Sequence, residues 1–342
     1  MSRFILTGAT LFDGTRLRRG LAVVVEDGQI AALTDRPPPG ETVALRGGIL
    51  APGMIDLQVN GGGGRMVDGT ATPASLAALC DTHARLGATG ILPTLITDTP
   101  QATAAVVAAG IAAARAGVPG FLGLHLEGPH LDPARKGAHD AALIRPMQPE
   151  DLARLCAAAR ALPALMVTLA PAAVHPEQVA RLAAAGVIVS LGHADCTHAQ
   201  AEALHRAGAR AVTHLFNAMS PLGHREPGLV GAALALDLAV GLIADGHHVH
   251  PAAMRLALAA KRRGRVFLVS DAMAVAGTDL RAFRLGGREI GRAGGRLTLA
   301  DGTLAGADLT LPQAVRVLVG AGVPRARALA MATAHPAEVI GR

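Results

Sequence analysis

The sequence contains no tryptophan and no tyrosine, and six phenylalanines supply the 2% of aromatic residues. Proteins that hold single-stranded nucleic acid stack the bases on such side chains, so their absence argues against a nucleic-acid partner. The net charge of +6 does not reverse that inference, because the arginines are scattered and the longest basic cluster is Lys261-Arg262-Arg263. An anionic small substrate accounts for the positive charge equally well.

Cysteine is also scarce. Cys80, Cys156 and Cys196 lie far apart and form no C-x-x-C pair, which is typical of a reduced cytoplasmic protein. The N-terminus has no long hydrophobic run, since its first apolar stretch soon reaches Asp13 and Gly14. This pattern is neither a signal peptide nor a transmembrane span, so we expect a cytoplasmic protein without a membrane partner.

What the sequence does contain is a repeating pattern. Hydrophobic residues make up 51% of the 342 residues, enough to bury a large core. From about residue 50, eight short apolar runs alternate with alanine-rich stretches. The runs, each expected to be a strand, span residues 48–59, 90–96, 121–126, 164–169, 187–191, 211–215, 240–244 and 266–269. The helices expected between them span residues 73–87, 100–117, 149–161, 176–185, 197–207 and 251–263.

Prolines mark several of the expected helix starts. Pro73, Pro149, Pro176 and Pro251 stand at first helical positions, where a missing N–H costs no hydrogen bond. Eight strands alternating with helices predict an α/β fold, a (β/α)8 barrel of the TIM type. A doubly wound open sheet is the alternative, but no G-x-G-x-x-G follows a strand in this sequence.

The two ends of the chain have a different pattern. Residues 1–50 contain short strands and turns, with a hairpin turn at Glu26-Asp27-Gly28. Strand-like pieces return after residue 280, and they predict a small β-sandwich domain built from the N- and C-terminal segments. The expected domains are residues 1–50 (first part of the small β domain), 51–280 (barrel) and 281–342 (return to the small β domain, plus a C-terminal helix).

Polar side chains follow the expected strands where a barrel opens at its C-terminal mouth. Glu127 ends the third strand, while His193 and His214 lie at the ends of the fifth and sixth. A carboxylate and two imidazoles are ligands for Zn²⁺ or Fe²⁺, and three protein ligands leave a position open for water. Asp271, after the eighth strand, would face that water. A lone histidine at a strand end is more often structural, but agreement at four strand ends favours a metal site; His125 is a weaker ligand candidate or a supporting group.

Eight short segments around these residues form a recognisable set. They are Pro52–Asp56, His125–Pro129, Gly137–His139, Gly192–His193, Thr213–Met219, Arg225–Gly228, Ala244–Val249 and Ser270–Met273. In these segments the sequence closely resembles the N-acetylglucosamine-6-phosphate deacetylases, a family within the amidohydrolase superfamily. The Glu-Gly-Pro segment combined with His-Leu-Phe-Asn-Ala-Met is specific within that superfamily, and the resemblance runs from about residue 3 to residue 341.

The resemblance implies a role for each matching residue. Glu127, His193 and His214 would be the metal ligands. Asp271 would be the general base that activates the metal-bound water and then protonates the departing amine, and His139 would polarise the acetyl carbonyl or stabilise the tetrahedral intermediate. The expected substrate contacts are Ala138, His139, Asn217, Ala218, Arg225, His248, Leu304, Ala305 and Gly306.

The implied reaction is the hydrolysis of N-acetylglucosamine 6-phosphate to glucosamine 6-phosphate and acetate, in amino-sugar catabolism and cell-wall sugar recycling. In this family an arginine like Arg225 reaches into the partner subunit's site, which implies a homodimer. Two alternatives remain open. A related amidohydrolase could act on another N-acyl substrate, but a neutral substrate would not need both Arg225 and His248. A barrel that binds sugar phosphates without turnover would not need Asp271 as a base.

The sequence departs from the superfamily in two places. Many members carry His-x-His on the first strand and hold a second metal ion, whereas Gln58 and Asn60 occupy these positions here. Neither Lys136 nor Lys261 lies at the end of the fourth strand, where two-metal members carry a bridging lysine. We therefore expect one divalent metal ion per subunit, with zinc favoured and iron, cobalt or manganese as alternatives. Family members also continue beyond Arg342, so we expect the small β domain to be shortened.

Overall fold

The centre of the computed structural model, which describes residues 2–342, is a parallel eight-stranded sheet rolled into a barrel. The strand order is β17-β16-β15-β14-β13-β12-β11-β8, and a parallel bridge between Val59 and Ala272 closes the ring. This confirms the predicted (β/α)8 barrel over the alternative open sheet. The strands are β8 (Met54–Val59), β11 (Ala88–Ile96), β12 (Leu124–Glu127), β13 (Leu165–Leu169), β14 (Ile188–Leu191), β15 (Ala211–Val212), β16 (Ala239–Leu242) and β17 (Val266–Leu268).

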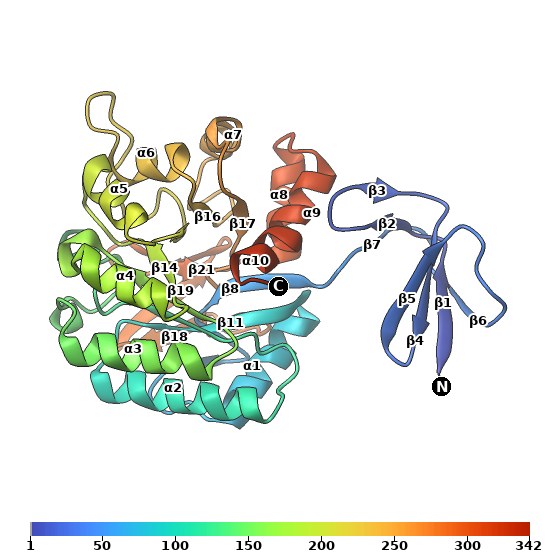
Figure 1. Cartoon of the computed structure of the whole chain (residues 1–342), viewed down its shortest axis with the longest axis horizontal. Coiled ribbons are helices and arrows are strands. Elements are labelled where there is room, and N and C mark those ends of the chain that lie inside the picture. The colour runs from blue at the N-terminus through green and yellow to red at the C-terminus, as the bar shows by residue number, and fades with distance from the viewer. Residues whose placement is uncertain (1) are drawn as a thin grey trace.

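Helices cover the outside of the barrel (Figure 1). The six helices expected between the strands are present, and Pro73, Pro149, Pro176 and Pro251 each occupy a first helical position. The sequence pattern missed α6, because its eight residues are almost all apolar or glycine and leave no polar face to reveal a helical period. The helices are α1 (Pro73–Arg85), α2 (Pro100–Arg115), α3 (Pro149–Ala161), α4 (Pro176–Ala184), α5 (His198–Arg206), α6 (Gly228–Ala235) and α7 (Pro251–Ala260).

A layer of buried polar side chains crosses the barrel interior. The Nε2 atom of His125 lies 2.7 Å from Oγ1 of Thr168, which lies 2.6 Å from Oγ1 of Thr213. The Oγ1 atom of Thr213 in turn lies 2.7 Å from Oγ of Ser190. These bonds satisfy polar groups that would otherwise be costly to bury. His125 therefore belongs to the supporting layer, and its ring nitrogens are engaged by hydroxyl groups.

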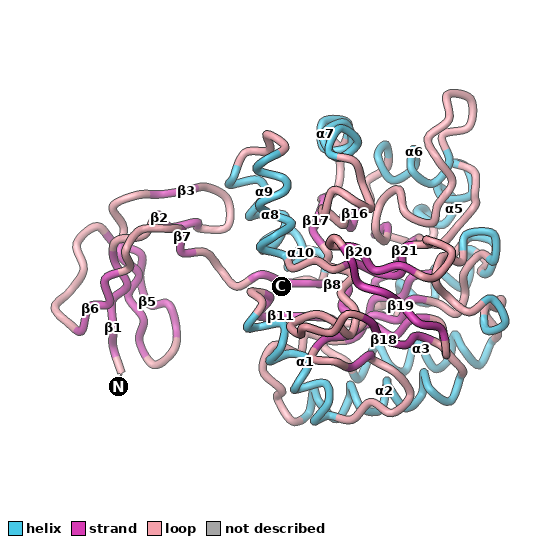
Figure 2. Tube along the Cα trace, turned by 180° about the vertical axis from the view of Figure 1, so that it is seen from behind, coloured by secondary structure: helices cyan, strands magenta, loops and turns pink. Residues whose placement is uncertain are grey.

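The strands after the barrel do not return to the N-terminal sheet. They form their own antiparallel sheet, in the order β18-β19-β20-β21, and join the barrel through a bridge between Ala272 and Ala307. The pairing therefore differs from the expected β-sandwich built from both ends of the chain, because each hairpin of this sheet pairs locally with the next. Figure 2 shows these strands beside the barrel. They are β18 (Ala282–Leu285), β19 (Arg288–Ala293), β20 (Arg296–Thr298) and β21 (Leu304–Ala307).

The N-terminal residues form a separate lobe beside the barrel (Figures 1 and 2). One sheet has the order β5-β4-β1-β6 and a second has the order β3-β2-β7. The predicted hairpin turn is present, with Asp27 at φ 47° and Gly28 at φ 78°, as a tight turn between twisted strands requires. The strands are β1 (Arg3–Thr7), β2 (Thr10–Phe12), β3 (Leu17–Arg18), β4 (Ala22–Glu26), β5 (Gln29–Thr34), β6 (Glu41–Ala44) and β7 (Ile49–Leu50).

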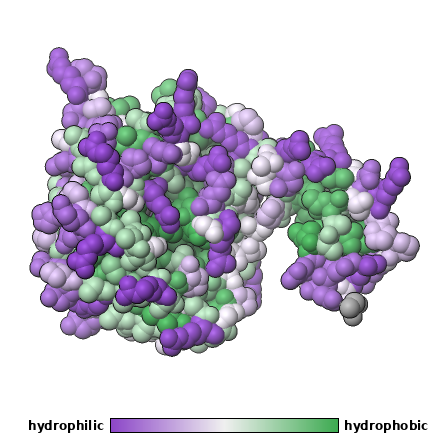
Figure 3. All heavy atoms as spheres, in the orientation of Figure 1, coloured by the Kyte–Doolittle hydropathy of each residue, from purple (hydrophilic) through white to green (hydrophobic). Residues whose placement is uncertain are grey.

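This lobe packs against the barrel but leaves hydrophobic side chains of its edge strands exposed. Phe12 is fully buried and belongs to the same hydrophobic cluster as the barrel core. By contrast, Ile30, Leu33 and Val43 are 71%, 41% and 41% exposed, and Figure 3 shows hydrophobic surface on the lobe.

Two further short strands, β9 (Gly61–Gly62) and β10 (Arg65–Met66), form a ribbon that follows β8.

The chain ends in three helices where the sequence predicted one. They are α8 (Leu311–Gly320), α9 (Arg325–Ala332) and α10 (Ala334–Val339). The Nδ1 atom of His335 in α10 lies 2.7 Å from the carbonyl oxygen of Val266 in β17, which ties this end to the barrel. Within residues 2–342, no helix has the length and hydropathy needed to cross a membrane.

Candidate active site

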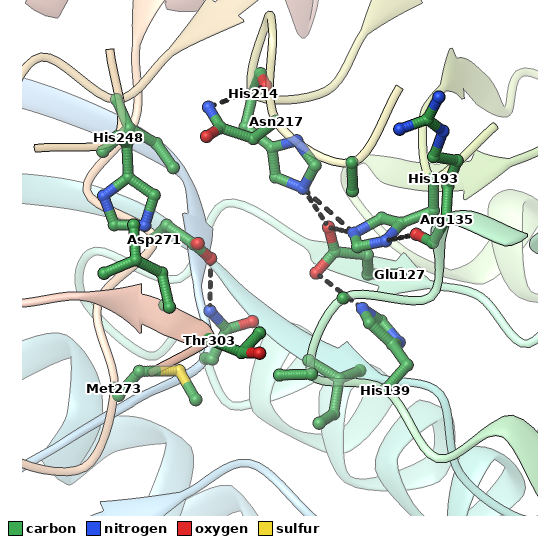
Figure 4. A pocket seen from close by; sticks show the side chains of 18 of the residues that line it. Glu127, Arg135, His139, His193, His214, Asn217, His248, Asp271, Met273 and Thr303 are labelled. Carbon is green, nitrogen blue, oxygen red and sulfur yellow. Dashed lines mark hydrogen bonds and ion pairs between the residues drawn. The ribbon is translucent and has the colours of Figure 1, made fainter. Parts of the chain in front are cut away.

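Three buried side chains converge on one point at the C-terminal mouth of the barrel (Figure 4). The Oε1 atom of Glu127 lies 3.2 Å from Nε2 of His193 and 3.0 Å from Nε2 of His214. The two Nε2 atoms are 3.1 Å apart. Each side chain comes from the end of a different barrel strand, as the sequence predicted, so the barrel itself brings these three groups together.

The chemistry of this cluster fits a divalent metal ion. Nδ1 of His193 lies 2.9 Å from the carbonyl oxygen of Arg135, and because a carbonyl only accepts, Nδ1 carries the proton and Nε2 presents its lone pair to the cluster. Ligand atoms at bond lengths of about 2.0–2.1 Å around tetrahedral Zn²⁺ stand roughly 3.3–3.4 Å from one another. The three separations between Glu127, His193 and His214 approach that value, so one cation could bind all three side chains.

His139 also borders the cluster, and it groups with Glu127 and His193 by proximity alone. Its Nε2 atom is 3.8 Å from Oε2 of Glu127, farther than either of the other imidazoles. Its Nδ1 atom is held by Thr97, whose Oγ1 lies at 2.8 Å and whose backbone N–H lies at 3.3 Å. We therefore favour His214 as the third ligand.

The site is built on strained backbone. Among residues 2–342, six non-glycine residues have positive φ, and five of these lie at the mouth of the barrel. Such conformations cost free energy and persist only where the surrounding structure holds them. They turn the chain sharply as it leaves the strands. The five are His193 (φ 45°), His214 (φ 27°), Phe216 (φ 76°), Ala218 (φ 51°) and Asp271 (φ 51°).

Asp271 faces the cluster from the end of β17 and is held by the amides of Gln58 in β8 and of Asn60 directly after it. Nε2 of Gln58 donates to Oδ1 of Asp271 at 3.0 Å and also to Oε1 of Glu127 at 3.0 Å. Nδ2 of Asn60 donates to the same Oδ1 atom of Asp271 at 2.7 Å. Both amides therefore bind one oxygen of the carboxylate, which leaves Oδ2 as the oxygen available for proton transfer.

Burial and charge shift the acidities in the site. Burial, with the negative charge of Glu127, raises the pKa of Asp271 to about 6, which suits a group that must gain and lose a proton near neutrality. Burial alone would raise the pKa of Glu127, but the adjacent imidazoles of His193 and His214 hold it well below its usual value. Burial and the neighbouring His193 lower the pKa of His139 to about 3, so its ring is neutral.

A cavity of about 530 Å³ opens from this cluster. Most predicted substrate contacts line it. Ala305 is buried behind its neighbours and is not among the lining residues, whereas Thr303 and Gly302, which were not predicted, are. The predicted residues that line it are Ala138, His139, Asn217, Ala218, His248, Leu304 and Gly306.

Two of these lining residues have fixed orientations. Nδ1 of His248 lies 2.6 Å from Oδ2 of Asp245, which leaves Nε2 as the free ring nitrogen. Nδ2 of Asn217 donates to the carbonyl oxygens of His214 and Leu215 at 3.2 and 3.1 Å. The amide of Asn217 thus braces its own turn, and its remaining polar atom is an acceptor.

Arg225 lies outside this cavity. It is exposed in the loop that leads into α6, and this loop is braced because Oε1 of Glu226 accepts the N–H groups of His198 and Gly228 at 2.7 and 3.0 Å. The cationic side chain that does line the cavity is Arg135, which sequence reasoning missed. Its guanidinium donates to Oδ1 of Asp195 at 3.0 Å.

The sequence also did not predict that Gln58 and Asn60 hold Asp271. They were noted only as replacements for the histidine pair of other superfamily members. The alternation of side chains along a strand was a signal that could have revealed it. Asp56, Gln58 and Asn60 are spaced by two, so they share the face of β8 that carries the site.

Comparison with known proteins gives a consistent picture. Residues 49–342 match the model of the Amidohydrolase family. The chain is 38% identical to N-acetylgalactosamine-6-phosphate deacetylase of Shewanella sp. strain ANA-3, over 99% of this chain and 87% of that protein. It is 38% identical to N-acetylglucosamine-6-phosphate deacetylase of Bacillus subtilis, over 86% of this chain and 76% of that protein.

Solved structures agree with this result. The crystal structure of N-acetylglucosamine-6-phosphate deacetylase from Pasteurella multocida superposes with a TM-score of 0.94 at 33% identity. The match covers 99% of this chain and 90% of that one. Both the barrel and its flanking sheets therefore have counterparts in a solved structure.

Proposed function

Because the chain belongs to the amidohydrolase family, among its amino-sugar-6-phosphate deacetylases, we propose that it hydrolyses N-acetylglucosamine 6-phosphate to glucosamine 6-phosphate and acetate. The observation that carries this proposal is the juxtaposition of the Glu127–His193–His214 cluster with Asp271, in a cavity large enough for a sugar phosphate. Amide hydrolysis needs an activated water and a proton for the leaving nitrogen, and this arrangement can supply both.

One divalent metal ion, zinc by our proposal, would be held by Glu127, His193 and His214. When bound, such an ion acts as a Lewis acid and lowers the pKa of a water ligand to about 7. A second ion lacks a ligand set, because Gln58 and Asn60 present neutral amides that are already bonded to Asp271.

The side chains divide the remaining tasks. Oδ2 of Asp271 takes a proton from the attacking water and then delivers it to the amide nitrogen as the C–N bond breaks. The Nε2–H group of His139 donates to the acetyl carbonyl oxygen and stabilises the negative charge that develops there. His139 suits this task because its ring is neutral and its Nδ1 is anchored on Thr97.

The phosphate is assigned to the opposite side of the cavity. His248, oriented by Asp245, offers its free ring nitrogen, and the N–H group of Ala218 offers a backbone donor. The side chain of Asn217 shapes this turn through its bonds to His214 and Leu215. We place Arg225 on the phosphate of a neighbouring copy, because it is exposed on a braced loop outside its own cavity. A homodimer follows from that assignment.

N-acetylgalactosamine 6-phosphate is the second candidate substrate. The Shewanella relative named for that activity is as similar to this chain as the Bacillus relative, and matches more of it. The two sugars differ only in the orientation of the hydroxyl at C4. We assign the reaction to amino-sugar catabolism and cell-wall sugar recycling in the cytoplasm, where the free thiols of Cys80, Cys156 and Cys196 stay reduced.

Acetate release from the two N-acetylhexosamine 6-phosphates tests the proposal, with unphosphorylated N-acetylglucosamine as the control. We expect the metal-loaded protein to act on the phosphorylated sugars and to favour the glucosamine derivative in kcat/KM. A preference for the galactosamine derivative would transfer the assignment to that epimer. Equal turnover of the unphosphorylated sugar would remove the phosphate roles of His248 and Arg225. No acetate from any of the three sugars would contradict the proposed function.

A further inference from the structure

Asn60, a residue of the active-site cavity wall, has an unmatched hydrogen-bond acceptor. Its side chain is 1% exposed and lines the cavity. Nδ2 donates to Oδ1 of Asp271 at 2.7 Å, which fixes the orientation of the amide. Its Oδ1 atom is buried and has no hydrogen-bond partner within residues 2–342. The amide cannot be turned over to remove the mismatch, because an oxygen would then face the carboxylate of Asp271.

A buried acceptor without a partner is costly, so native structures rarely keep one without a use. Asn60 lies on the wall of a cavity that is built to receive a ligand, and a donor from that ligand would complete its bonding. The neighbouring amide of Gln58 differs in this respect. Gln58 also donates to Asp271, but it is not among the residues that line the cavity.

The position of Asn60 beside Asp271 identifies which ligand donor it meets. In the proposed reaction Asp271 must reach the amide nitrogen of the substrate in order to protonate it, so that nitrogen lies next to Asp271. The nitrogen carries one N–H group. An acceptor bonded to the same carboxylate is therefore placed to receive that N–H.

We propose that Oδ1 of Asn60 accepts a hydrogen bond from the N–H of the scissile amide. This inference rests on the proposed function and adds a catalytic residue to it. Once water has attacked, the nitrogen becomes tetrahedral and holds one hydrogen and one lone pair. Fixing the hydrogen on Asn60 directs the lone pair toward Asp271, which protonates it as the C–N bond breaks. Asn60 itself neither gains nor loses a proton.

This role makes Asn60 a determinant of selectivity for amides over esters. An ester has oxygen in place of the N–H and offers Asn60 nothing to accept. A site with a polar group intended for a substrate N–H discriminates against an analogue without it, because the protein atom is then left unpaired. If Asn60 only positioned Asp271, its loss would affect both kinds of substrate as the loss of Gln58 does.

The test compares N-acetylglucosamine 6-phosphate with its 2-O-acetyl glucose 6-phosphate counterpart. The value of kcat/KM is measured on both compounds for the wild type, Asn60→Leu and the matched control Gln58→Leu, and thermal unfolding verifies that each variant folds. We expect Asn60→Leu to lower the amide-to-ester ratio by about tenfold more than Gln58→Leu does, the size of one hydrogen bond. Equal ratios in the two variants would overturn the role of Asn60. Failure of the wild type to release acetate from the amide would instead reject the proposed function.

A second measurement needs no Asn60 variant. A crystal structure of the wild-type protein with glucosamine 6-phosphate would give the distance from Oδ1 of Asn60 to the amine nitrogen. We expect a hydrogen bond of about 3.2 Å or less. A sugar bound at the site with its amine bonded elsewhere would overturn the inference.

Discussion

The Nε2 atoms of His193 and His214 lie 3.1 Å apart, and Oε1 of Glu127 is within 3.2 Å of both. Three ligand atoms at these separations fit around one divalent ion. His139 lies at the edge of the same group, so the two possible ligand sets differ in whether they include His214 or His139.

Metal content distinguishes these sets. We expect about one divalent ion per chain in the wild type, since three ligands define a single catalytic site. His214→Ala should lose the ion, whereas the control His139→Gln should retain it and lose activity, because His139 is assigned to the carbonyl. Elemental analysis of the purified proteins gives both answers. Two ions per chain, both lost on mutating Glu127, His193 or His214, would contradict the single site.

Asp271→Asn tests the proton transfer. The variant keeps the size of the side chain but cannot take a proton from water, so we expect kcat to fall about a hundredfold or more. Metal content and the unfolding temperature should stay close to those of the wild type. Retention of substantial acetate release in the metal-loaded variant would show that another group acts as the base.

Much of this site could be predicted because a barrel imposes a simple rule. Side chains that follow parallel strands gather at one mouth, so Glu127, His193, His214 and Asp271 could be grouped from their positions after apolar runs. The rule has no counterpart for loops. The place of Arg225 depends on how the segment before α6 projects, and that is set by bonds such as those of Glu226.

The parts that sequence could not predict depend on long-range pairing. Strands β18–β21 have the same local pattern whether they join the N-terminal sheet or one another. Their pairing with one another and the bridge between Ala272 and Ala307 show their place. Similarly, an apolar helix such as α6 has no amphipathic period. The positive φ angles of His193 and Asp271 could not be predicted either, because neither residue is a glycine and tertiary packing imposes the angles.

Stability should depend on pH through Asp56. Its carboxylate is buried and accepts the N–H groups of Ser270 and Gln58 at 3.2 Å. Burial raises its pKa from 3.8 to about 7. The folded protein therefore binds this proton more tightly than the unfolded chain. The contribution of Asp56 to folding stability is full below about pH 4 and is lost as pH rises to about 7.

The variant Asp56→Asn isolates this effect. An asparagine can still accept through its oxygen but does not ionise, so its stability relative to the wild type should improve between pH 5 and pH 8, by on the order of a few kcal/mol at most. Thermal unfolding of both proteins at the two pH values provides the comparison, and other titrating groups cancel in the difference. An unchanged difference would show that the carboxylate stays ionised in the folded protein throughout.

The exposed position of Arg225 predicts complementation between two impaired variants. Arg225→Ala should raise KM for the phosphorylated sugar, because a charge-assisted contact to phosphate is lost, and should leave turnover of an unphosphorylated sugar unchanged. Asp271→Asn should be impaired for a different reason, because it lacks the base. In a hybrid dimer, the site that keeps Asp271 receives Arg225 from its partner and is complete.

Mixing the two variants under conditions that exchange subunits should therefore restore part of the wild-type activity at low substrate concentration. If subunits exchange and no activity returns, Arg225 acts within its own chain or not on the substrate.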